Sequence, residues 1–365
     1  MKILYIIPAL IEAGGVEKIL YDWISRFDRQ KITVDILAGK IFSEYQKHKF
    51  EAAGCAVYEF GDSMWFIHRR IPKLKTILAN GYDMLHVHSS SPVDAYMLAV
   101  GKQFGIKTRI IHSHNAVKTR KITTCIAFAI SKPFLRKFAT HFWGCSEKAI
   151  YALCGRTKKI ENNHRVIKNG IQIERYLYNK EARAEIRKKY NLEGKFVVGN
   201  VGRMCSQKNQ LFLLDVFSEV LKRDKNSMLL LVGDGNQRNL IEEKARKLVI
   251  AGNVIFTGNV PDPSSFYQAM DCFAMPSLYE GLVIAGIEAQ TAGLQCVLSS
   301  LITKEVQITK NVEFISLHDS PAYWAERILA TSGSPRKDMS ETIKSAGYDI
   351  ETVAKELQDL YLEMN

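Results

Sequence analysis

The chain has 365 residues, 47% of them hydrophobic and 24% charged, which excludes a disordered protein and suits two domains of ordinary size. No apolar run reaches the roughly 18 residues that span a bilayer, and the start lacks a secretory cleavage site. The seven cysteines include no Cys-x-x-Cys pair, which argues against a disulfide framework or a zinc site. The net charge of +12 is uneven: residues 1–170 carry 27 Lys and Arg against 13 Asp and Glu, whereas residues 171–365 carry 23 against 25. We therefore expect a cytoplasmic protein whose first half meets an anionic partner.

Short β-branched runs alternate with longer amphipathic stretches along the first half of the chain. The pattern predicts strands over residues 2–7, 32–37, 57–60, 84–87, 108–112 and 141–145. Helical segments separate them, beginning with a helix over 16–27 that follows a Gly-Gly loop. This alternation is typical of a parallel sheet with helices on both faces.

A second cycle of the same kind follows the segment 166–173. It predicts strands over 196–201, 227–232, 254–257, 272–275, 295–298 and 312–315, and helices over 209–222, 238–248, 282–291 and 349–364. The simplest fold is α/β, with two doubly wound, Rossmann-like domains that face a cleft. We place the domains at 1–170 and 171–348, and expect the C-terminal helix, 349–365, to pack back on the first domain. Ligands of such sheets bind beyond the carboxyl ends of the strands.

A loop of sequence Pro-Ser-Leu-Tyr-Glu-Gly precedes one predicted helix and sets Glu280 and Glu288 eight residues apart. Gly281 allows the backbone to approach a ligand closely. The amides of Leu282 and Val283 are expected at the positive end of the helix dipole, which forms an anion site suited to a diphosphate. Because a carboxylate repels phosphate, we assign Glu280 to hydroxyls of a hexose and Glu288 to hydroxyls of a ribose.

A second element ends at the same predicted sheet edge. Gly202 clears space after its strand, and Arg203 and Lys208 bring two cations to the edge. Two cations beside a helix N-terminus can stabilise a leaving diphosphate without a metal ion. Since no Asp-x-Asp occurs in the chain, we expect no metal ion at this site. We also expect no resident cofactor.

The first domain offers candidates at its own strand ends. Gly14 and Gly15 lie at a helix N-terminus after the first strand, and His114 belongs to a His-Ser-His-Asn segment that should point into the cleft. His86 and His88 share one strand face, but no Asp, Glu or Cys joins them, so we assign them core or loop roles rather than metal binding.

Two basic and apolar stretches, residues 68–75 and 118–138, also lie in the first domain. Basic amphipathic segments bind anionic membrane surfaces. The alternative interpretation is a solvated helix face. We expect peripheral contact with the inner face of the cell membrane, and no motif for nucleic-acid binding is present.

Together these motifs resemble the retaining glycosyltransferases of family 4, of the GT-B superfamily, which build bacterial capsules and exopolysaccharides. The resemblance rests on Gly-x-x-Gly-Arg followed by Gln-Lys-Asn, on Gly-Asp-Gly at 233–235, on the segment 253–260 and on the Glu-x7-Glu pair. One departure is Gly286 inside the helix between the two acids, where the family usually has an aliphatic residue; a helical glycine costs about 1 kcal/mol.

The resemblance implies roles for the candidate residues. Glu280 would hold the donor sugar, Glu288 the ribose, and Arg203 and Lys208 the diphosphate. The loop at Val260 would hold the base through its backbone. In the first domain, the resemblance places His114 near the donor hexose and the Gly14–Gly15 loop next to the acceptor and the donor phosphates.

The activity that the resemblance implies is metal-independent, retaining transfer of a hexose or N-acetylhexosamine from a UDP-sugar to a saccharide acceptor. The acceptor in this family is often linked to a polyprenyl diphosphate. Two alternatives stay open: a UDP-sugar epimerase of similar fold, and a non-catalytic partner subunit of a glycosyltransferase complex.

Overall fold

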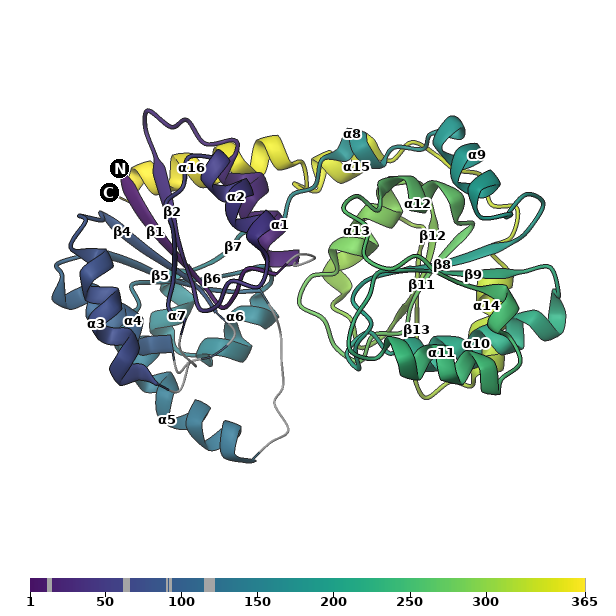
Figure 1. The fold of residues 1–365 in the computed structure, drawn as a ribbon, viewed down its shortest axis with the longest axis horizontal. Helices are drawn as coiled ribbons and strands as arrows, with labels where there is room; N and C mark the ends of the chain where they lie inside the picture. Colours follow the sequence, from purple (N-terminus) through teal and green to yellow (C-terminus); the bar gives the residue numbers. More distant parts are fainter. Residues whose placement is uncertain (12–14, 62–65, 90, 92–93, 115–121, 365) are drawn as a thin grey trace. The chain divides into compact units, whose positions relative to one another are not determined.

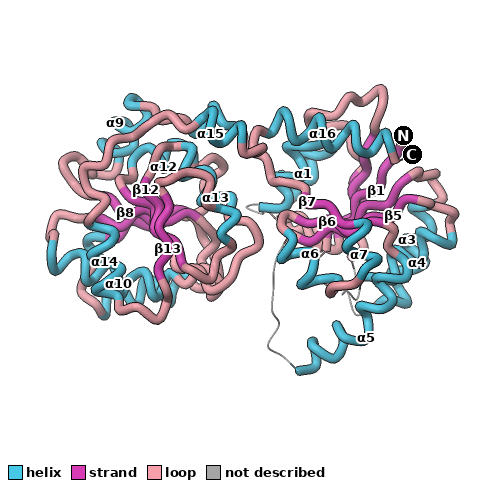
Figure 2. Tube along the Cα trace, turned by 180° about the vertical axis from the view of Figure 1, so that it is seen from behind, coloured by secondary structure: helices cyan, strands magenta, loops and turns pink. Residues whose placement is uncertain are grey.

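The computed structural model describes residues 1–11, 15–61, 66–89, 91, 94–114 and 122–364, apart from the side chains of 122–124. The chain divides into two compact units, the first made of Met1–Gly170 with Ile350–Asn365 and the second of Ile171–Asp349. Each unit is built around its own parallel sheet with helices on both faces (Figures 1 and 2). This architecture confirms the predicted fold class of two doubly wound α/β domains.

The first unit has a seven-stranded sheet in the order β3-β2-β1-β4-β5-β6-β7. Its strands are β1 Lys2–Ile7, β2 Thr33–Ala38, β3 Val57–Glu59, β4 Met84–His88, β5 Thr108–Ser113, β6 His141–Gly144 and β7 His164–Val166. Its helices are α1 Gly15–Ile24, α2 Glu44–Ala52, α3 Ile67–Leu78, α4 Ala95–Gln103, α5 Ile122–Phe138, α6 Glu147–Cys154, α7 Lys158–Asn163 and α16 Ile350–Glu363. Helices α1 and α16 cover one face of the sheet, and α4 to α6 cover the other (Figure 1).

The last helix, α16, belongs to the first unit although its sequence follows the second. Its Tyr361 hydroxyl lies 2.6 Å from the hydroxyl of Tyr5 on β1. Toward its start, the Glu351 carboxylate accepts a hydrogen bond of 2.7 Å from Arg26. The chain leaves and re-enters the unit side by side: a Cβ on Gly170 would lie only 2.7 Å from the Cα of Ile350, so glycine is required there.

The second unit has a six-stranded sheet in the order β10-β9-β8-β11-β12-β13. Its strands are β8 Val197–Val201, β9 Met228–Val232, β10 Val254–Phe256, β11 Cys272–Met275, β12 Gln295–Ser299 and β13 Val312–Ile315. Its helices are α8 Ile173–Tyr176, α9 Lys180–Lys189, α10 Gln210–Arg223, α11 Arg238–Lys247, α12 Ser264–Ala269, α13 Ile284–Thr291, α14 Pro321–Leu329 and α15 Ser340–Ser345, with short 3-10 turns η2 Ala251–Asn253 and η3 Lys304–Val306.

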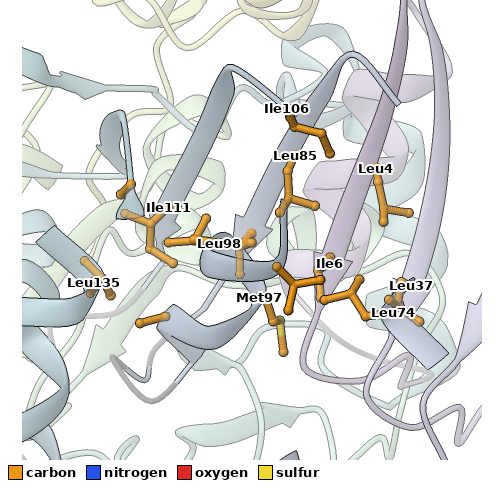
Figure 3. Close-up of a cluster of buried hydrophobic side chains, with 14 of the residues drawn as sticks. Leu4, Ile6, Leu37, Leu74, Leu85, Met97, Leu98, Ile106, Ile111 and Leu135 are labelled. Carbon is orange, nitrogen blue, oxygen red and sulfur yellow. The ribbon is translucent and has the colours of Figure 1, made fainter. Parts of the chain in front are cut away.

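Each unit has an apolar core between its sheet and its helices. In the first unit, side chains from β1, β4 and β5 meet those of α3, α4 and α5, as Figure 3 shows for Leu4, Leu85 and Leu98. In the second unit, the run Met-Leu-Leu-Leu-Val of β9 is buried at every position. Strands of a parallel sheet are buried on both faces, so they read as continuous apolar runs rather than alternating ones.

Candidate active site

The second unit has a switch point in its strand order. The chain builds β8 first, continues through β9 and β10 on one side, and then crosses to β11 on the other side of β8. The loops that follow β8 and β11 therefore leave the same edge of the sheet in opposite directions. Ligands of open α/β sheets bind at such a point. Both sequence motifs of this unit, the one around Gly202 and the one around Glu280, lie in these two loops.

Backbone packing holds the loop that follows β8. Gly202, whose φ is +153°, donates its amide to the Val232 carbonyl at 2.9 Å. Gly233 lies so close that an added Cβ would come within 2.3 Å of the Gly202 carbonyl oxygen, and a Cβ on Gly235 would come equally close to the Met204 oxygen. The Gly-Asp-Gly segment, residues 233–235, is thus a platform that packs against the backbone of the loop that follows β8.

A substitution at Gly233 should therefore destabilise this platform. We expect Gly233→Ala to lower the free energy of unfolding of the second unit by about 3 kcal/mol, because the new Cβ meets backbone and the φ of +131° is strained for alanine. Urea unfolding measures the effect. Gly252→Ala is the matched control, since a Cβ there has no neighbour within 4 Å. Equal stability of both variants would contradict the packing role.

Two amide side chains tie the loops after β8 and β11 together. The Gln207 side chain donates to the Tyr279 carbonyl at 3.1 Å and to Glu280 Oε2 at 3.0 Å. Asn209 donates to the Pro276 carbonyl at 3.1 Å, and the Leu278 amide donates to the Gln207 carbonyl at 2.8 Å. Gln207 and Asn209 had no predicted role, although both belong to the Gln-Lys-Asn motif. Gln207 thus holds the carboxylate of Glu280 directly, and Asn209 fixes the backbone of the loop that carries it.

Glu280 and Lys208, which were predicted as separate ligands, form an ion pair. Lys208 Nζ lies 2.8 Å from Glu280 Oε1, with 17% of the lysine side chain and 7% of the glutamate side chain exposed. The pair neutralises a buried carboxylate and leaves the ammonium further donors for a ligand. Arg203, in contrast, is exposed, and no carboxylate of the described chain pairs with it. This edge of the sheet therefore carries one ion pair, Lys208 with Glu280, and one arginine, Arg203, that no carboxylate of the described chain neutralises.

The helix after Glu280 begins two residues later than predicted. It starts at Ile284, because Val283 has the extended backbone of an N-cap, with φ −85° and ψ 91°. Leu282 and Val283 thus precede the first turn instead of forming it. Within the described chain, the amides of Gly281, Leu282 and Val283 donate to no acceptor. These buried donors, next to the positive end of the helix, can bind an anion.

Close packing around α13 explains why residue 286 is a glycine. A Cβ at this position would lie 3.1 Å from Val306 Cγ2 and 3.4 Å from Val283 Cγ1. The close approach of η3 to the helix explains why an aliphatic residue would not fit without movement of its neighbours.

Glu288 lies on α13, between two buried tyrosines. Tyr176 donates to Glu288 Oε1 and Tyr267 donates to Oε2, each at 2.7 Å. Nothing in the sequence signalled these tyrosines as partners. The carboxylate is 4% exposed, so the hydroxyls fix it in one orientation. Each carboxylate oxygen can accept more than one hydrogen bond, so Glu288 keeps the capacity to accept hydrogen bonds from ribose hydroxyls. Its role at a ribose remains a prediction. Val260 lies beyond β10 and is half-buried.

In the first unit, Gly15 is the first residue of α1, whereas Gly14 lies outside the described residues. His114 follows β5 directly, and its Nε2 lies 2.9 Å from Nδ1 of His88. Burial lowers the pKa of His114 to about 4. The ring is therefore neutral at neutral pH and can either donate or accept a hydrogen bond.

His86, His88 and His112 are buried, which agrees with core roles for the first two. One ring nitrogen from each of the three lies within 4.8 Å of the others, a spacing at which histidines can hold a metal ion. However, both nitrogens of His86 have hydrogen-bond partners, Nδ1 in Tyr361 at 2.6 Å and Nε2 in His112 at 3.1 Å. Burial lowers the pKa of all three well below the usual range. We interpret the group as a neutral, hydrogen-bonded stack.

Two family models match almost the whole chain in succession. The model described as "Glycosyltransferase Family 4" matches residues 13–175, and the model described as "Glycosyl transferases group 1" matches residues 182–347. The first therefore covers the unit with the histidines, and the second covers the unit with the Lys208–Glu280 pair.

Known proteins are similar over the full length. The chain is 27% identical to the "Putative glycosyltransferase EpsF" of Bacillus subtilis, over 99% of this chain and 96% of that protein. It is 23% identical to the Escherichia coli "UDP-Gal:alpha-D-GlcNAc-diphosphoundecaprenol alpha-1,3-galactosyltransferase", over 80% and 78%. Among solved structures, Anabaena HepE in complex with UDP and glucose superposes with a TM-score of 0.80 at 19% identity and covers 100% of both chains.

Proposed function

Because the chain belongs to family 4 of the GT-B glycosyltransferases, we propose that it transfers a hexose or N-acetylhexosamine from a UDP-sugar to a saccharide acceptor, with retention of configuration. The observation that carries this proposal is the Lys208–Glu280 pair, held at the switch point beside Arg203 and the unbonded amides that precede α13. The UDP and glucose bound by HepE, and the UDP-galactose named for the Escherichia coli relative, support a UDP-sugar donor.

The reaction follows from what these groups do to a nucleotide sugar. Arg203, Lys208 and the amides before α13 bind the diphosphate and stabilise the charge that grows on it as it leaves. Glu280 accepts hydrogen bonds from hexose hydroxyls and orients the ring. The bond from the anomeric carbon to the phosphate oxygen breaks, and the acceptor oxygen bonds to that carbon from the same face. The departing phosphate oxygen takes the acceptor proton. Orientation and electrostatics supply the catalysis, and no base residue is required.

The acceptor in this proposal is a saccharide carried on a polyprenyl diphosphate, and the pathway is cell-surface polysaccharide synthesis. The diphosphoundecaprenol acceptor named for the Escherichia coli relative supports this class. A panel of UDP-sugars, screened by thermal shift, identifies the donor. Mass spectrometry and the anomeric coupling of the purified product then establish transfer and retention, in the presence of EDTA.

The outcomes of this assay separate the alternatives. Transfer that persists in EDTA, with an α-linked product from an α-linked donor, supports the proposal. A strict metal requirement or an inverted product contradicts it. Interconversion of free UDP-sugars without acceptor would identify an epimerase. Binding of a UDP-sugar with no turnover on any acceptor would favour a non-catalytic partner subunit.

Helix α5 supports the proposal of peripheral binding to an anionic membrane on the inner face of the cell membrane. Over the described side chains of α5, the solvent-facing positions are almost entirely apolar: Cys125, Ile126, Ala129, Ile130, Pro133 and Phe134, followed by Lys137. The large side chains Ile126, Ile130 and Phe134 are 53% to 61% exposed, while the opposite face buries Leu135. Helix α5 runs along the outer edge of the first unit (Figures 1 and 2).

Charge on the same unit favours an anionic lipid over another apolar protein surface. Lys132, Arg136 and Lys137 lie in the last two turns of α5, within the part of the chain that carries the excess of basic residues. An apolar stripe flanked by basic residues is typical of a helix that lies in the headgroup region. No helix of the described residues is both long and apolar enough to cross a bilayer.

We expect Ile130→Glu with Phe134→Glu to weaken binding to phosphatidylglycerol vesicles at least about tenfold, because two exposed apolar side chains no longer enter the lipid. Vesicle sedimentation measures the binding, and phosphatidylcholine vesicles should bind weakly. Leu240→Glu on α11 is the control, since Leu240 is also half exposed but lies in the second unit. An unchanged affinity of the double variant would contradict a role of α5.

A further inference from the structure

Asn209 has an unusual backbone for a residue that precedes a helix. It is the N-cap of α10, yet its φ of 57° and ψ of 38° lie in the left-handed region. An N-cap normally has an extended backbone, and an asparagine there accepts a hydrogen bond from an amide of the first turn with its side-chain oxygen. Within the described chain, Asn209 makes no such cap bond. Helix α10 thus begins without the cap that its own sequence offers.

The side chain of Asn209 holds the loop that follows β11 instead. Its amide nitrogen donates to the Pro276 carbonyl at 3.1 Å. The two residues before it reach the same loop. Lys208 pairs with Glu280 at 2.8 Å, and Gln207 donates to the same carboxylate at 3.0 Å. Three consecutive side chains therefore meet a single loop, residues 276–280.

The left-handed backbone explains how consecutive side chains can do this. The amide of Lys208 closes a turn by donating to the Cys205 carbonyl at 3.0 Å, and α10 then begins at Gln210. With right-handed helical angles at residue 209 the helix would begin earlier, and successive side chains would point about 100° apart around its axis. The left-handed residue interrupts that progression, so neighbouring side chains face the same loop.

The position of Asn209 in the chain points to function rather than to the end of a helix. A left-handed backbone is costly for residues other than glycine, and asparagine is among the few that adopt it. Among the described non-glycine residues, Asn191 and Val249 share the conformation, and both follow the C-terminal ends of helices, α9 and α11. That is where such residues commonly occur. Asn209 precedes a helix, at the predicted diphosphate site, and strained backbone is often retained at sites of this kind.

We propose that Asn209 is a positioning residue: its left-handed backbone aims Lys208 at Glu280 and at the leaving diphosphate, while its amide holds the loop that carries Glu280. The proposal rests on the proposed function for the diphosphate, whereas the contact between Lys208 and Glu280 exists without a ligand. The lysine stem crosses Gly202, where a Cβ would lie 3.1 Å from Lys208 Cε. Asn209 touches no reacting atom and acts through the direction of this side chain.

Urea unfolding tests the positioning without any ligand. A double-variant cycle of Lys208→Met and Glu280→Gln measures the coupling between the two side chains. We expect Asn209→Gly to keep most of this coupling, because glycine adopts the left-handed conformation readily. In Asn209→Ala the coupling should fall to less than about half, because alanine favours the right-handed region. An unchanged coupling in Asn209→Ala, or an equal loss in Asn209→Gly, would overturn the proposal.

Sugar transfer, with the UDP-sugar identified by thermal shift, provides the second readout. We expect kcat/KM to fall about tenfold in Asn209→Ala and to stay within about threefold of the wild type in Asn209→Gly. Asn191→Ala is the matched control, because Asn191 is a left-handed asparagine of the same unit, exposed after the end of α9. It should lose stability as Asn209→Ala does and keep the transfer rate of the wild type.

The control also separates positioning from stability. A loss of transfer in Asn191→Ala as large as in Asn209→Ala would show a merely structural role of the left-handed asparagine and overturn the proposal. If the wild type transferred no sugar, the proposed function would fail, while the unfolding cycle would still decide whether Asn209 positions Lys208.

Discussion

Arg203→Ala should lower kcat/KM for sugar transfer by about 10²–10³-fold while leaving the melting temperature unchanged. The guanidinium lies at the carboxyl edge of β8, is exposed, and pairs with no carboxylate of the described chain. Its removal therefore leaves no buried charge without a partner. In the proposed reaction the same guanidinium stabilises the leaving diphosphate, so the loss should appear in the chemical step.

The matched control is Arg246→Ala on α11, which removes an exposed arginine from the same unit. It should leave both kcat/KM and stability unchanged. Arg203→Lys keeps the charge without the planar fork and should fall between the wild type and Arg203→Ala. If Arg203→Ala transferred sugar at the wild-type rate, the assignment of the diphosphate site would fail.

Lys208→Ala should differ from Arg203→Ala because it breaks an ion pair as well as the diphosphate site. Glu280 would keep a carboxylate that is 5% exposed without its counter-ion, which costs about 3 kcal/mol of unfolding free energy. Glu280→Ala should likewise abolish sugar transfer, because the hexose hydroxyls lose the carboxylate that accepts their hydrogen bonds. Chemical denaturation of single and double variants separates the two effects: Lys208→Ala with Glu280→Ala should be more stable than Lys208→Ala alone. The opposite order would contradict the pairing.

The sequence predicted the strands well because each sheet is parallel and buried on both faces. The runs at β1, β9 and β11 are almost purely apolar, and such runs between amphipathic segments have few other solutions. Helix α9 was not predicted from the sequence because Ile186 is its only large apolar residue. Its arginines instead bind a single carboxylate from another part of the unit: Arg183 and Arg187 both contact Asp271, at 2.6 Å and 3.2 Å.

The candidate site was predictable by residue type but not by pairing. Lys208 and Glu280 could be placed at one sheet edge, since the loops after neighbouring parallel strands meet there. Their ion pair depends on the paths of two loops and on the hydrogen bond from Gln207 to Glu280. These two residues are 73 positions apart in the sequence. The same holds for Tyr176, which reaches Glu288 across 112 residues. Local patterns carry no information about such contacts.

Mild acid should unfold the first unit before the second. Burial lowers the pKa of His114 to about 4 and that of the other three histidines of the stack well below the usual range. In the unfolded chain all four take up protons near pH 6.5. The unfolded state thus binds more protons as the pH falls below about 6.5, and stability is lost in that direction. Above that pH the contribution of the neutral histidines is fully present.

The expected size is large because four groups act together. Each histidine lowers the unfolding free energy by about 1.4 kcal/mol per pH unit once the unfolded form is protonated, so the stack removes about 5 kcal/mol between about pH 7.5 and about pH 5.5. His141, whose pKa burial also lowers, adds to the loss. Asp94 changes the free energy of unfolding in the opposite direction, since burial raises the pKa of its carboxyl, but its effect falls mainly at more acidic pH.

Hydrogen exchange read by mass spectrometry makes the second unit an internal control. That unit contains a single histidine, His318, so its stability should change much less over this range. We expect amides of β4 and β5 to lose protection at about pH 5.5, after correction for intrinsic exchange rates, while amides of β8 and β11 keep it. Helix α16 should open together with β4, because Tyr361 is hydrogen-bonded to His86. Full protection of β4 and β5 under these conditions would mean that the folded stack takes up protons as readily as the unfolded chain, which would contradict a neutral histidine stack.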